Sequence, residues 1–572
     1  MMLPATVGLL LPGTFLRHPD AISGEPGSSV AGRELLRALL TYSEVPLTLF
    51  VSEYHADAMR RECLILADIT GFDTFPSHRI IPIHQMAYAL ANMPLLALHD
   101  LNGPFLDLVA YARSRFADGA MFPVTCMEYG FSYQNFLREL VVRLLLTPTY
   151  PCDALVCTTQ VAKQATQNIL QRLRERLQED FGCSLPSPFQ LAVIPHGIDT
   201  DLFKPRDKAD MRTLLELPKD KLIVLYMGRI DPASKSDVIP LLIAFQRVAQ
   251  KHADQVLLLL VGPITDIYRG KVDEVIRELG LQGKVLLRTG IPKVNVPLYY
   301  SAADIFISLS DTLQENFGLT PLEAMASGLP VVVSDWAGYR ELVVHGETGF
   351  KVPTMWGESD ETLCDLAPFY DWSSDHFYVG QTVAAKPEAV AHFLDLLVSN
   401  EPLRQEIGKR ARQHVLSHYH WRNIVRQFWE LWSTLREVAT SIERSFKTDG
   451  LIRPRYYCDF QHFATFAIHG DDRVYLTQRG FRVCCRKEGL FLLDDARSLL
   501  RSDAAMKFLR FIRYCTALRL PLTIAQVEKV VGHKWKMSPE EVRRYILWAF
   551  KYGLIHIHHA GEEIKGSSLP QR

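Results

Sequence analysis

The stretch ENFGLTPLEAMASGLPVVVSD, residues 315–335, places a loop, a helix and a strand in immediate succession. Thr320, Pro321 and Glu323 predict the helix start, with the threonine as N-cap and the glutamate completing a capping box. Gly328 suits the C-cap, and the apolar run after it predicts a buried strand. Glu323 can therefore be explained as a helix cap. Glu315 lies in a glycine-bearing loop and has no such explanation.

The same order of short apolar run, polar loop and helical pattern recurs through residue 415. The runs are ATVGLLLPG, PLTLFVSE, LIVLYMGR, QVLLLLVGP, KVLLRTG, DIFISLS and GLPVVVSD. Continuous apolar strands that alternate with helices predict parallel sheets covered on both faces. Ligands of such sheets bind beyond the carboxyl ends of the strands, where most of these glycine-bearing loops lie.

The chain has 572 residues, more than one hydrophobic core normally spans. Pro195 and Gly197 predict a hinge between two doubly wound domains, residues 1–195 and 196–415. Residues 416–448 contain an amphipathic helix, and residues 449–572 change in style. A hairpin at 473–495, three helices at 503–516, 522–531 and 538–552 and a short final strand predict a small α+β, winged-helix-like domain there. Thr523 and Ser538 are expected N-caps, Ser538 with Glu541 in a capping box.

The net charge also differs between the C-terminal part of the chain and the rest. Residues 451–572 carry 21 Lys and Arg against 12 Asp and Glu, so this part is +9 while the rest is −10. Glu540 and Glu541 interrupt the basic patch of Arg543, Arg544 and Lys551, which disfavours nucleic-acid binding. We expect a module that docks a protein or peptide, or a packing extension.

Several special classes of site are disfavoured. The ten cysteines form no paired CxxC motif, so reduced thiols of a cytoplasmic protein are expected rather than structural zinc. No apolar run is long enough for a transmembrane helix, and the N-terminal apolar run is interpreted as a strand rather than a signal peptide. Asp199 and Asp201 lie in the hinge and are expected to form turns, not to bind metal. Asp375 and His376 are assigned to an aromatic-rich surface insertion.

A second loop supplies cations. Gly228, Arg229 and Lys235 follow the strand LIVLYM, and the arginine fork and lysine charge suit a diphosphate. The Glu315 loop offers a carboxylate for sugar hydroxyls and backbone amides for phosphate. Together the two loops predict a site for a sugar-linked diphosphate.

The motifs GRIDPASK, RTGIPKVNVPLYYSAADIFISLS, VIPHGIDTDLFKP and the 315–350 segment resemble family 4 retaining glycosyltransferases (glycosyltransferases group 1). The resemblance implies the GT-B fold, in which two Rossmann-like domains face each other across a cleft. It is strong over residues 190–435, weaker before them and absent from 450 onward. It also implies that the helix in residues 416–448 crosses back to the first domain.

The resemblance also implies roles. Arg229, Lys235 and Glu315 would be the catalytic residues, the first two holding the diphosphate and the third the donor sugar. Glu323 would bind the ribose hydroxyls, and the backbone around Ile291 would meet the base. The remaining donor-binding residues would be Gly228, Asn316, Phe317, Gly318 and Leu319.

The acceptor side is assigned by position. The first glycine-rich loop offers Gly27, Ser28 and Ser29, while Arg33-Glu34 replaces the residues that a P-loop requires. Relatives carry a histidine where this chain has Glu128. His18 is a candidate substitute for it, and Glu128 itself is either a catalytic-side carboxylate or has a capping or surface role.

The predicted function is transfer of a hexose from a nucleotide diphosphate sugar to an unidentified acceptor, which could be a glycan, lipid, small molecule or peptide. No cofactor or metal is expected. The alternatives are a nucleotide-sugar epimerase and a non-catalytic binding or regulatory protein with a partner-docking tail. The predicted location is cytoplasmic, with peripheral membrane association as an option.

Overall fold

The computed structural model divides the chain into two compact units, Met1–Ile452 and Arg453–Arg572. The residues that the structure describes are 6–11, 27–52, 59, 78–101, 103, 105–117, 120–132, 134–185, 188–357, 360–371, 374–443, 453–465, 467–490, 500, 502–518, 520 and 522–559.

The first sheet of unit 1 is parallel and has the strand order β3-β2-β1-β4-β5-β6-β7. Its strands are β1 (Thr6–Leu11), β2 (Leu47–Val51), β3 (Arg79–Pro82), β4 (Leu95–Asp100), β5 (Val124–Met127), β6 (Ala154–Cys157) and β7 (Gln190–Val193). Its helices are α1 (Gly27–Tyr42), α3 (Met86–Asn92), α4 (Asp107–Phe116), α5 (Gln134–Leu140), continued by a π-helical turn (Val141–Leu145), and α6 (Gln160–Phe181). The central strands β1, β4, β5 and β6 are buried almost throughout, as expected when helices cover both faces.

The second sheet is also parallel, with the order β10-β9-β8-β11-β12-β13. Its strands are β8 (Leu222–Met227), β9 (Val256–Val261), β10 (Val285–Arg288), β11 (Ile305–Ser308), β12 (Val331–Ser334) and β13 (Gly349–Val352). Helices α7 (Lys208–Leu214), α8 (Ile239–His252), α9 (Asp266–Glu278), α10 (Val296–Ala302), α11 (Leu319–Ala326) and α12 (Tyr339–Leu342) connect them. In both sheets the order reverses beside the first strand, which is the doubly wound pattern. The predicted pair of Rossmann-like domains is confirmed.

An insertion follows β13. A two-stranded ribbon, β14 (Thr354–Met355) with β15 (Ala384–Ala385), encloses α13 (Glu361–Leu366) and α14 (Ser374–Gly380). The chain then continues through α15 (Pro387–Ser399), α16 (Glu401–His418) and α17 (Trp421–Thr440).

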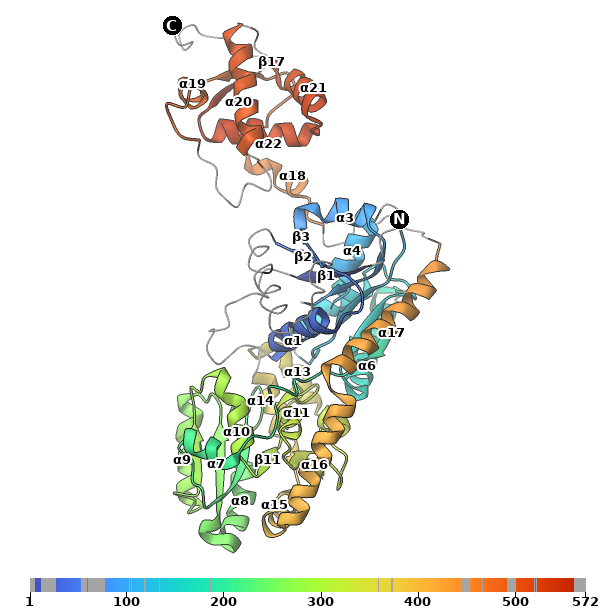
Figure 1. Ribbon diagram of the computed structural model, residues 1–572. Helices are drawn as coiled ribbons and strands as arrows, with labels where there is room; N and C mark the ends of the chain where they lie inside the picture. The colour runs from blue at the N-terminus through green and yellow to red at the C-terminus, as the bar shows by residue number, and fades with distance from the viewer. Residues whose placement is uncertain are drawn as a thin grey trace. The chain divides into compact units, whose positions relative to one another are not determined.

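Helix α17, orange in Figure 1, packs against α1 and β4 of the first domain. Trp421, Phe428 and Trp432 are buried in the core of that domain. The Trp432 indole N–H donates to Thr125 Oγ1 at 3.0 Å. The chain therefore returns to the first domain after completing the second.

Unit 2 begins with α18 (Tyr456–Asp459), whose residues are exposed. Its small antiparallel sheet contains β16 (Arg473–Leu476), β17 (Leu522–Thr523) and β18 (Ile555–His558). The remaining helices are α19 (Gln478–Cys484), α20 (Ser502–Ala517), α21 (Ile524–Trp535) and α22 (Pro539–Lys551). The predicted capping of α21 by Thr523 and of α22 by Ser538 is confirmed.

The predicted hairpin at 473–495 is wrong. Strand β16 ends at Leu476, and Thr477 caps α19 by accepting from the Gly480 N–H at 2.9 Å. Both edges of β16 are already paired, one with β17 and the other with β18. No edge is left for a hairpin partner, so the chain turns into a helix.

Candidate active site

Two loops leave the second sheet at the same edge. Strands β8 and β11 are parallel neighbours, so their carboxyl ends lie together. The loop after β8 carries Gly228, Arg229 and Lys235, and the loop after β11 carries Glu315. The Ser310 hydroxyl joins the loops by donating to the Lys235 carbonyl at 3.2 Å.

Lys235 and Glu315 meet directly at this edge. The Lys235 ammonium donates to Glu315 Oε2 in an ion pair whose side chains are only 18% and 7% exposed. The Tyr339 hydroxyl lies 3.1 Å from the same oxygen and donates to it. A buried carboxylate needs such donors, because burial of an unpaired charge is costly. The structure thus brings together two of the three predicted catalytic residues.

Glycines allow the backbone to pass closely around Glu315. Gly318 has a φ of 113°, and a Cβ there would lie 2.7 Å from the Tyr339 ring. A Cβ on Gly338 would lie 2.5 Å from the Phe317 Cα. Side chains at either position would push α12, which carries Tyr339, away from the loop. The loop's shape therefore depends on both glycines.

Arg229 takes a different position from Lys235. Its side chain is exposed, and its guanidinium lies 3.4 Å from the Ser234 carbonyl. The backbone carbonyl of Arg229 accepts from the buried Tyr226 hydroxyl at 2.7 Å. Arg229 is thus fixed through its main chain and keeps an accessible cation beside the pair.

Glu323 does not act as the predicted helix cap. Helix α11 starts at Leu319 after Gly318, without a side-chain cap, so the predicted N-cap Thr320 lies inside the first turn. Glu323 instead accepts from the Tyr300 hydroxyl at 2.6 Å. Burial raises the pKa of Glu323 to about 7, against the opposing effects of Tyr300 and Lys235. A polar tyrosine–carboxyl pair therefore lies one helix turn beyond the Glu315 loop.

Ile291, predicted near the base, is half-buried in the loop after β10. Strand β10 is at the edge of the sheet, two strands from β8. The half-buried Asn316, the buried Phe317 and Gly318 lie in the loop that contains Glu315, and the half-buried Leu319 is the first residue of α11.

The first domain reaches this loop through Glu128. Its carboxylate is buried and accepts from the Asn316 amide at 2.9 Å, and Thr158 Oγ1 lies 3.3 Å from the same nitrogen. Burial raises the pKa of Glu128 to about 7, although the Asn316 bond and the Gly130 backbone lower it. Glu128 is therefore neither a surface residue nor a helix cap.

The other acceptor-side candidates are only partly described. Gly27, Ser28 and Ser29 form the start of α1. His18 lies outside the described residues.

Three inter-domain contacts were missed by sequence reasoning. The Gln314 amide donates to Ser132 Oγ at 2.9 Å, and His376 Nε2 donates to the Ser132 carbonyl at 3.1 Å. Glu341 accepts from the first two backbone N–H groups of α6, at 2.9 and 2.7 Å. A carboxylate at a helix N-terminus is favourable. In the sequence, the polar loop 312–316 indicated that this part of the chain makes polar contacts. It did not indicate the partners, which lie far away in the sequence.

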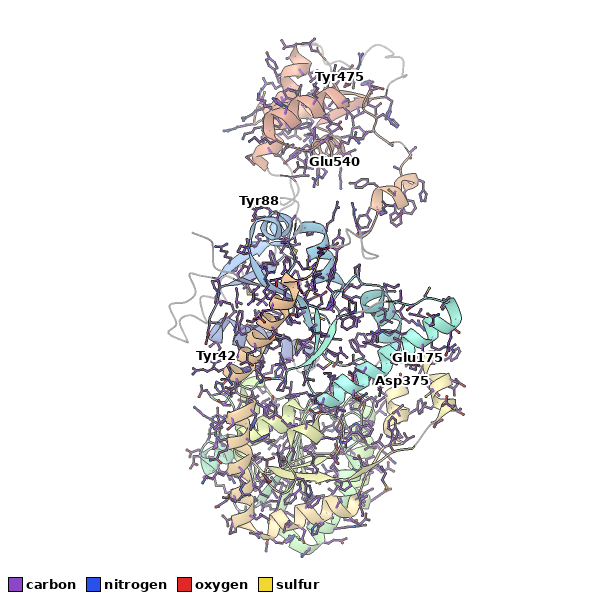
Figure 2. The ribbon with its side chains drawn as sticks, turned by 90° about the vertical axis from the view of Figure 1, so that its right-hand side faces the viewer. Tyr42, Tyr88, Glu175, Asp375, Tyr475 and Glu540 are labelled. Atoms are coloured by element: carbon purple, nitrogen blue, oxygen red, sulfur yellow. The ribbon has the colours of Figure 1, made fainter. Side chains whose placement is uncertain are left out.

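The assignment of Asp375 and His376 to the surface was wrong. Both side chains are buried at the start of α14, where Figure 2 labels Asp375. The His376 contact with Ser132 draws this part of the insertion against the first domain. The insertion therefore borders the site.

Asp311 is a further buried carboxyl group near the site. Burial and the neighbouring Asp237 raise its pKa to about 8. Its Oδ1 atom has no hydrogen-bond partner. Among the described residues there is no cluster of three or more His, Cys, Asp or Glu side chains suited to a metal ion. None of the described helices is both long and apolar enough to cross a membrane.

Comparisons with known proteins point to one family. Residues 207–361 match the family model for glycosyl transferases group 1. D-inositol 3-phosphate glycosyltransferase of Thermobispora bispora is 31% identical over 187 residues, which are 31% of this chain and 43% of that protein. A lipopolysaccharide core biosynthesis mannosyltransferase of Rhizobium meliloti is 35% identical over 161 residues, 27% of this chain and 44% of that protein. The chain thus spans less than half the length of either relative.

Solved structures are similar at lower identity. Sucrose-phosphate synthase from Thermosynechococcus elongatus is 20% identical with a TM-score of 0.47, covering 76% of this chain and all of that one. An Anabaena protein in complex with UDP-glucose is 18% identical with a TM-score of 0.46, covering 75% of this chain and 99% of that one.

Proposed function

Because residues 207–361 match the family model for glycosyl transferases group 1, we propose that this chain is a retaining glycosyltransferase. It transfers a hexose from a nucleotide diphosphate sugar to an acceptor. The observation that carries the proposal is the buried Lys235–Glu315 pair with Arg229 beside it at one sheet edge. This arrangement puts cations next to a carboxylate, as a sugar linked to a diphosphate requires.

The two cations bind the diphosphate. The accessible Arg229 offers paired N–H donors to phosphate oxygens, and Lys235 contributes a point charge. Their effect on the rate comes from stabilising the charge that develops on the departing nucleotide, which requires no metal ion. Because Lys235 is held by Glu315 before the donor arrives, the cation is already in position.

The carboxylates bind hydroxyl groups of the donor. Glu315 accepts from the donor sugar near the reacting carbon, with the backbone of residues 316–319 around it. Glu323, adjacent to Tyr300, accepts from the ribose hydroxyls. The backbone around Ile291 meets the base, since such contacts need no particular side chain.

Transfer with retention is proposed to occur on a single face of the sugar. The acceptor oxygen forms a bond to the anomeric carbon as the bond from that carbon to the phosphate oxygen breaks. The acceptor proton passes to the departing phosphate oxygen, so no protein nucleophile is required. The chain's contribution is positioning and charge stabilisation.

On the acceptor side, Glu128 fixes the Asn316 side chain from the first domain. We assign it a positioning role at the site's boundary. Gly27, Ser28 and Ser29, and His18 in the undescribed segment, are further candidates for the acceptor side. Nine described cysteines are free, which supports a cytoplasmic location. Peripheral membrane association and docking of a protein or peptide by unit 2 remain part of the proposal.

The test is nucleotide release from a panel of UDP-, GDP- and ADP-hexoses by the purified full chain. We expect release from at least one donor, and a loss of about a hundredfold in kcat/KM for Lys235→Ala and Glu315→Ala. The matched control is the exposed Lys271–Glu274 pair, whose alanine variants should retain activity. Unchanged release by the Lys235 and Glu315 variants would refute the site. Formation of a sugar epimer without nucleotide release would favour an epimerase. If no nucleotide sugar bound at all, a regulatory protein would be favoured.

A further inference from the structure

Exposed aromatic rings collect on the insertion that borders the site. Trp356, Phe369 and Tyr378 are 54%, 84% and 44% exposed. Tyr370 packs on Tyr378 with ring centroids 4.9 Å apart. We call Trp356, Phe369, Tyr370 and Tyr378 the aromatic platform. Thr382 links Trp356 to this pair, because its hydroxyl accepts from the Trp356 indole and donates to the carbonyl of Val379, the residue after Tyr378. Exposed large apolar side chains that lie together mark a binding surface.

The platform is connected to the loop that carries Glu315 through the neighbouring rings of Trp356 and Trp336. Trp356 Nε1 donates to Thr382 Oγ1 at 3.0 Å, just after α14. Its ring makes an edge contact with the Trp336 ring, with centroids 5.5 Å apart. Trp336 Nε1 in turn donates to the Thr312 carbonyl at 2.9 Å, three residues before Glu315. A ligand on Trp356 would therefore lie beside the loop that carries the reacting sugar.

The other side of the insertion meets the first domain. His376 on α14 donates to the Ser132 carbonyl, and Gln314, in the loop that carries Glu315, donates to the Ser132 hydroxyl. The start of α14 is thereby held against the first domain, and Trp356 contacts Trp336 of the second domain.

The negative charge of the insertion indicates which class of ligand the platform binds. Residues 356–385 contain no lysine or arginine and, besides the buried Asp375, five carboxylates: Glu358, Asp360, Glu361, Asp365 and Asp371. Such a segment repels phosphate groups and anionic lipid surfaces. It suits neutral saccharides, because pyranose C–H faces pack on aromatic rings and sugar hydroxyls donate to carboxylates.

We propose that the aromatic platform binds a neutral oligosaccharide, which is the acceptor of the transferase. This inference rests on the proposed function and adds the acceptor's class. It separates this chain from an enzyme whose acceptor is a phosphorylated cyclitol or an anionic lipid headgroup.

The experiment uses the full chain with maltohexaose, cellohexaose and a mannohexaose, and binding is followed by calorimetry. At least one hexasaccharide should bind and, with a donor present, gain one hexose by mass. Trp356→Ala and Phe369→Ala should each weaken that binding at least tenfold, with acceptor KM rising more than donor KM. Trp356→Phe should restore much of the affinity. Because Phe369 is 84% exposed, its truncation should not disturb folding, which thermal melting checks.

Tyr88→Ala is the matched control. Tyr88 is 76% exposed on α3, and Figure 2 shows it far from Asp375. The inference is overturned if no hexasaccharide binds, or if both alanine variants bind like the wild type. Preferential binding of myo-inositol 1-phosphate, of phosphatidylglycerol vesicles or of a protein would also overturn it. If a saccharide bound in a Trp356-dependent way but no donor released nucleotide, the aromatic platform would be confirmed as a saccharide site. The proposed transferase activity would then be refuted.

Discussion

Lys235 and Glu315 are two charges that depend on each other. Removing either one leaves the other in a mostly buried position, which typically costs about 3 kcal/mol or more. We expect Lys235→Met and Glu315→Gln each to lower the melting temperature, and the double variant to lose less than the sum of the two. A double-mutant cycle from thermal unfolding of the full chain measures this coupling. Additive losses would show that the pair is not coupled.

Glu323 predicts a pH dependence of nucleotide affinity. Its pKa is raised to about 7 in the free protein, chiefly by burial, and in the proposed role the ionised carboxylate is the stronger acceptor for ribose hydroxyls. Affinity for the released nucleotide should therefore fall by up to about tenfold per pH unit below 7. Glu323→Gln should bind more weakly at pH 8 and lose this dependence. Calorimetric titrations at pH 6, 7 and 8 provide the measurement, and a dependence that persists in the variant would assign it to another group.

Glu128 predicts a pH dependence of stability. Burial raises its pKa to about 7, so folding favours the protonated form. This contribution is fully present below the ordinary pKa near 4.5 and is lost as pH rises through 7. The fall in melting temperature from pH 5 to pH 8 should be smaller in Glu128→Gln than in the wild type. Since Glu323 and Asp311 titrate in the same direction, only the difference between the two proteins reports on Glu128. Identical slopes would contradict the assignment.

At this scale the sequence placed Lys235 and Glu315 at one sheet edge, because both follow strands of one parallel sheet. It did not predict that the two side chains form an ion pair. Thr320 was wrongly expected to cap α11, because Gly318, with its positive φ, lets the helix begin earlier. The bond between Glu128 and Asn316 joins residues of different domains, which no local pattern reveals.

Helix α6 begins where the two domains of unit 1 meet. Glu341 accepts from its first two N–H groups, and Thr159 caps it by accepting from Ala162 at 3.0 Å. We expect Glu341→Ala to destabilise this junction by about 1 kcal/mol, a usual cost of losing a cap, and to raise donor KM. Thermal melting and donor kinetics check it, with the exposed Glu347→Ala as the control. Equal behaviour of the two variants would contradict the inter-domain role.

Elements with local signals were predictable, and those that depend on distant partners were not. The capping signals of α21 and α22 are local, and both helices were predicted. The segment after β16 alternates like a strand, but β17 and β18 occupy both edges of β16. In α19, Gly480 approaches the Leu554 carbonyl so closely that a Cβ would lie 2.1 Å from it. Only the complete domain shows that this glycine serves helix packing.

At the scale of the whole chain, unit 1 does not end with the last strand of its second sheet but continues to residue 452. Helix α17 comes after the last strand of the second sheet, yet its tryptophans are buried in the core of the first domain. The structure assigns all residues through 452 to unit 1, and unit 2 has a separate hydrophobic core. Stability of the catalytic body should therefore require α17 but not unit 2.

Two truncations test this division. A chain of residues 1–452 should fold, melt cooperatively and release nucleotide with kcat/KM within about threefold of the full chain, because the proposed donor residues all lie in unit 1. A chain of residues 1–418 loses Trp421, Phe428 and Trp432 and should be insoluble or molten, since each large aromatic lost from a core costs about 3–5 kcal/mol. Circular dichroism, melting curves and donor assays separate the two. If 1–418 were folded and active, α17 would not be part of the first domain's core. If 1–452 were folded but inactive, unit 2 would contribute directly to the proposed reaction.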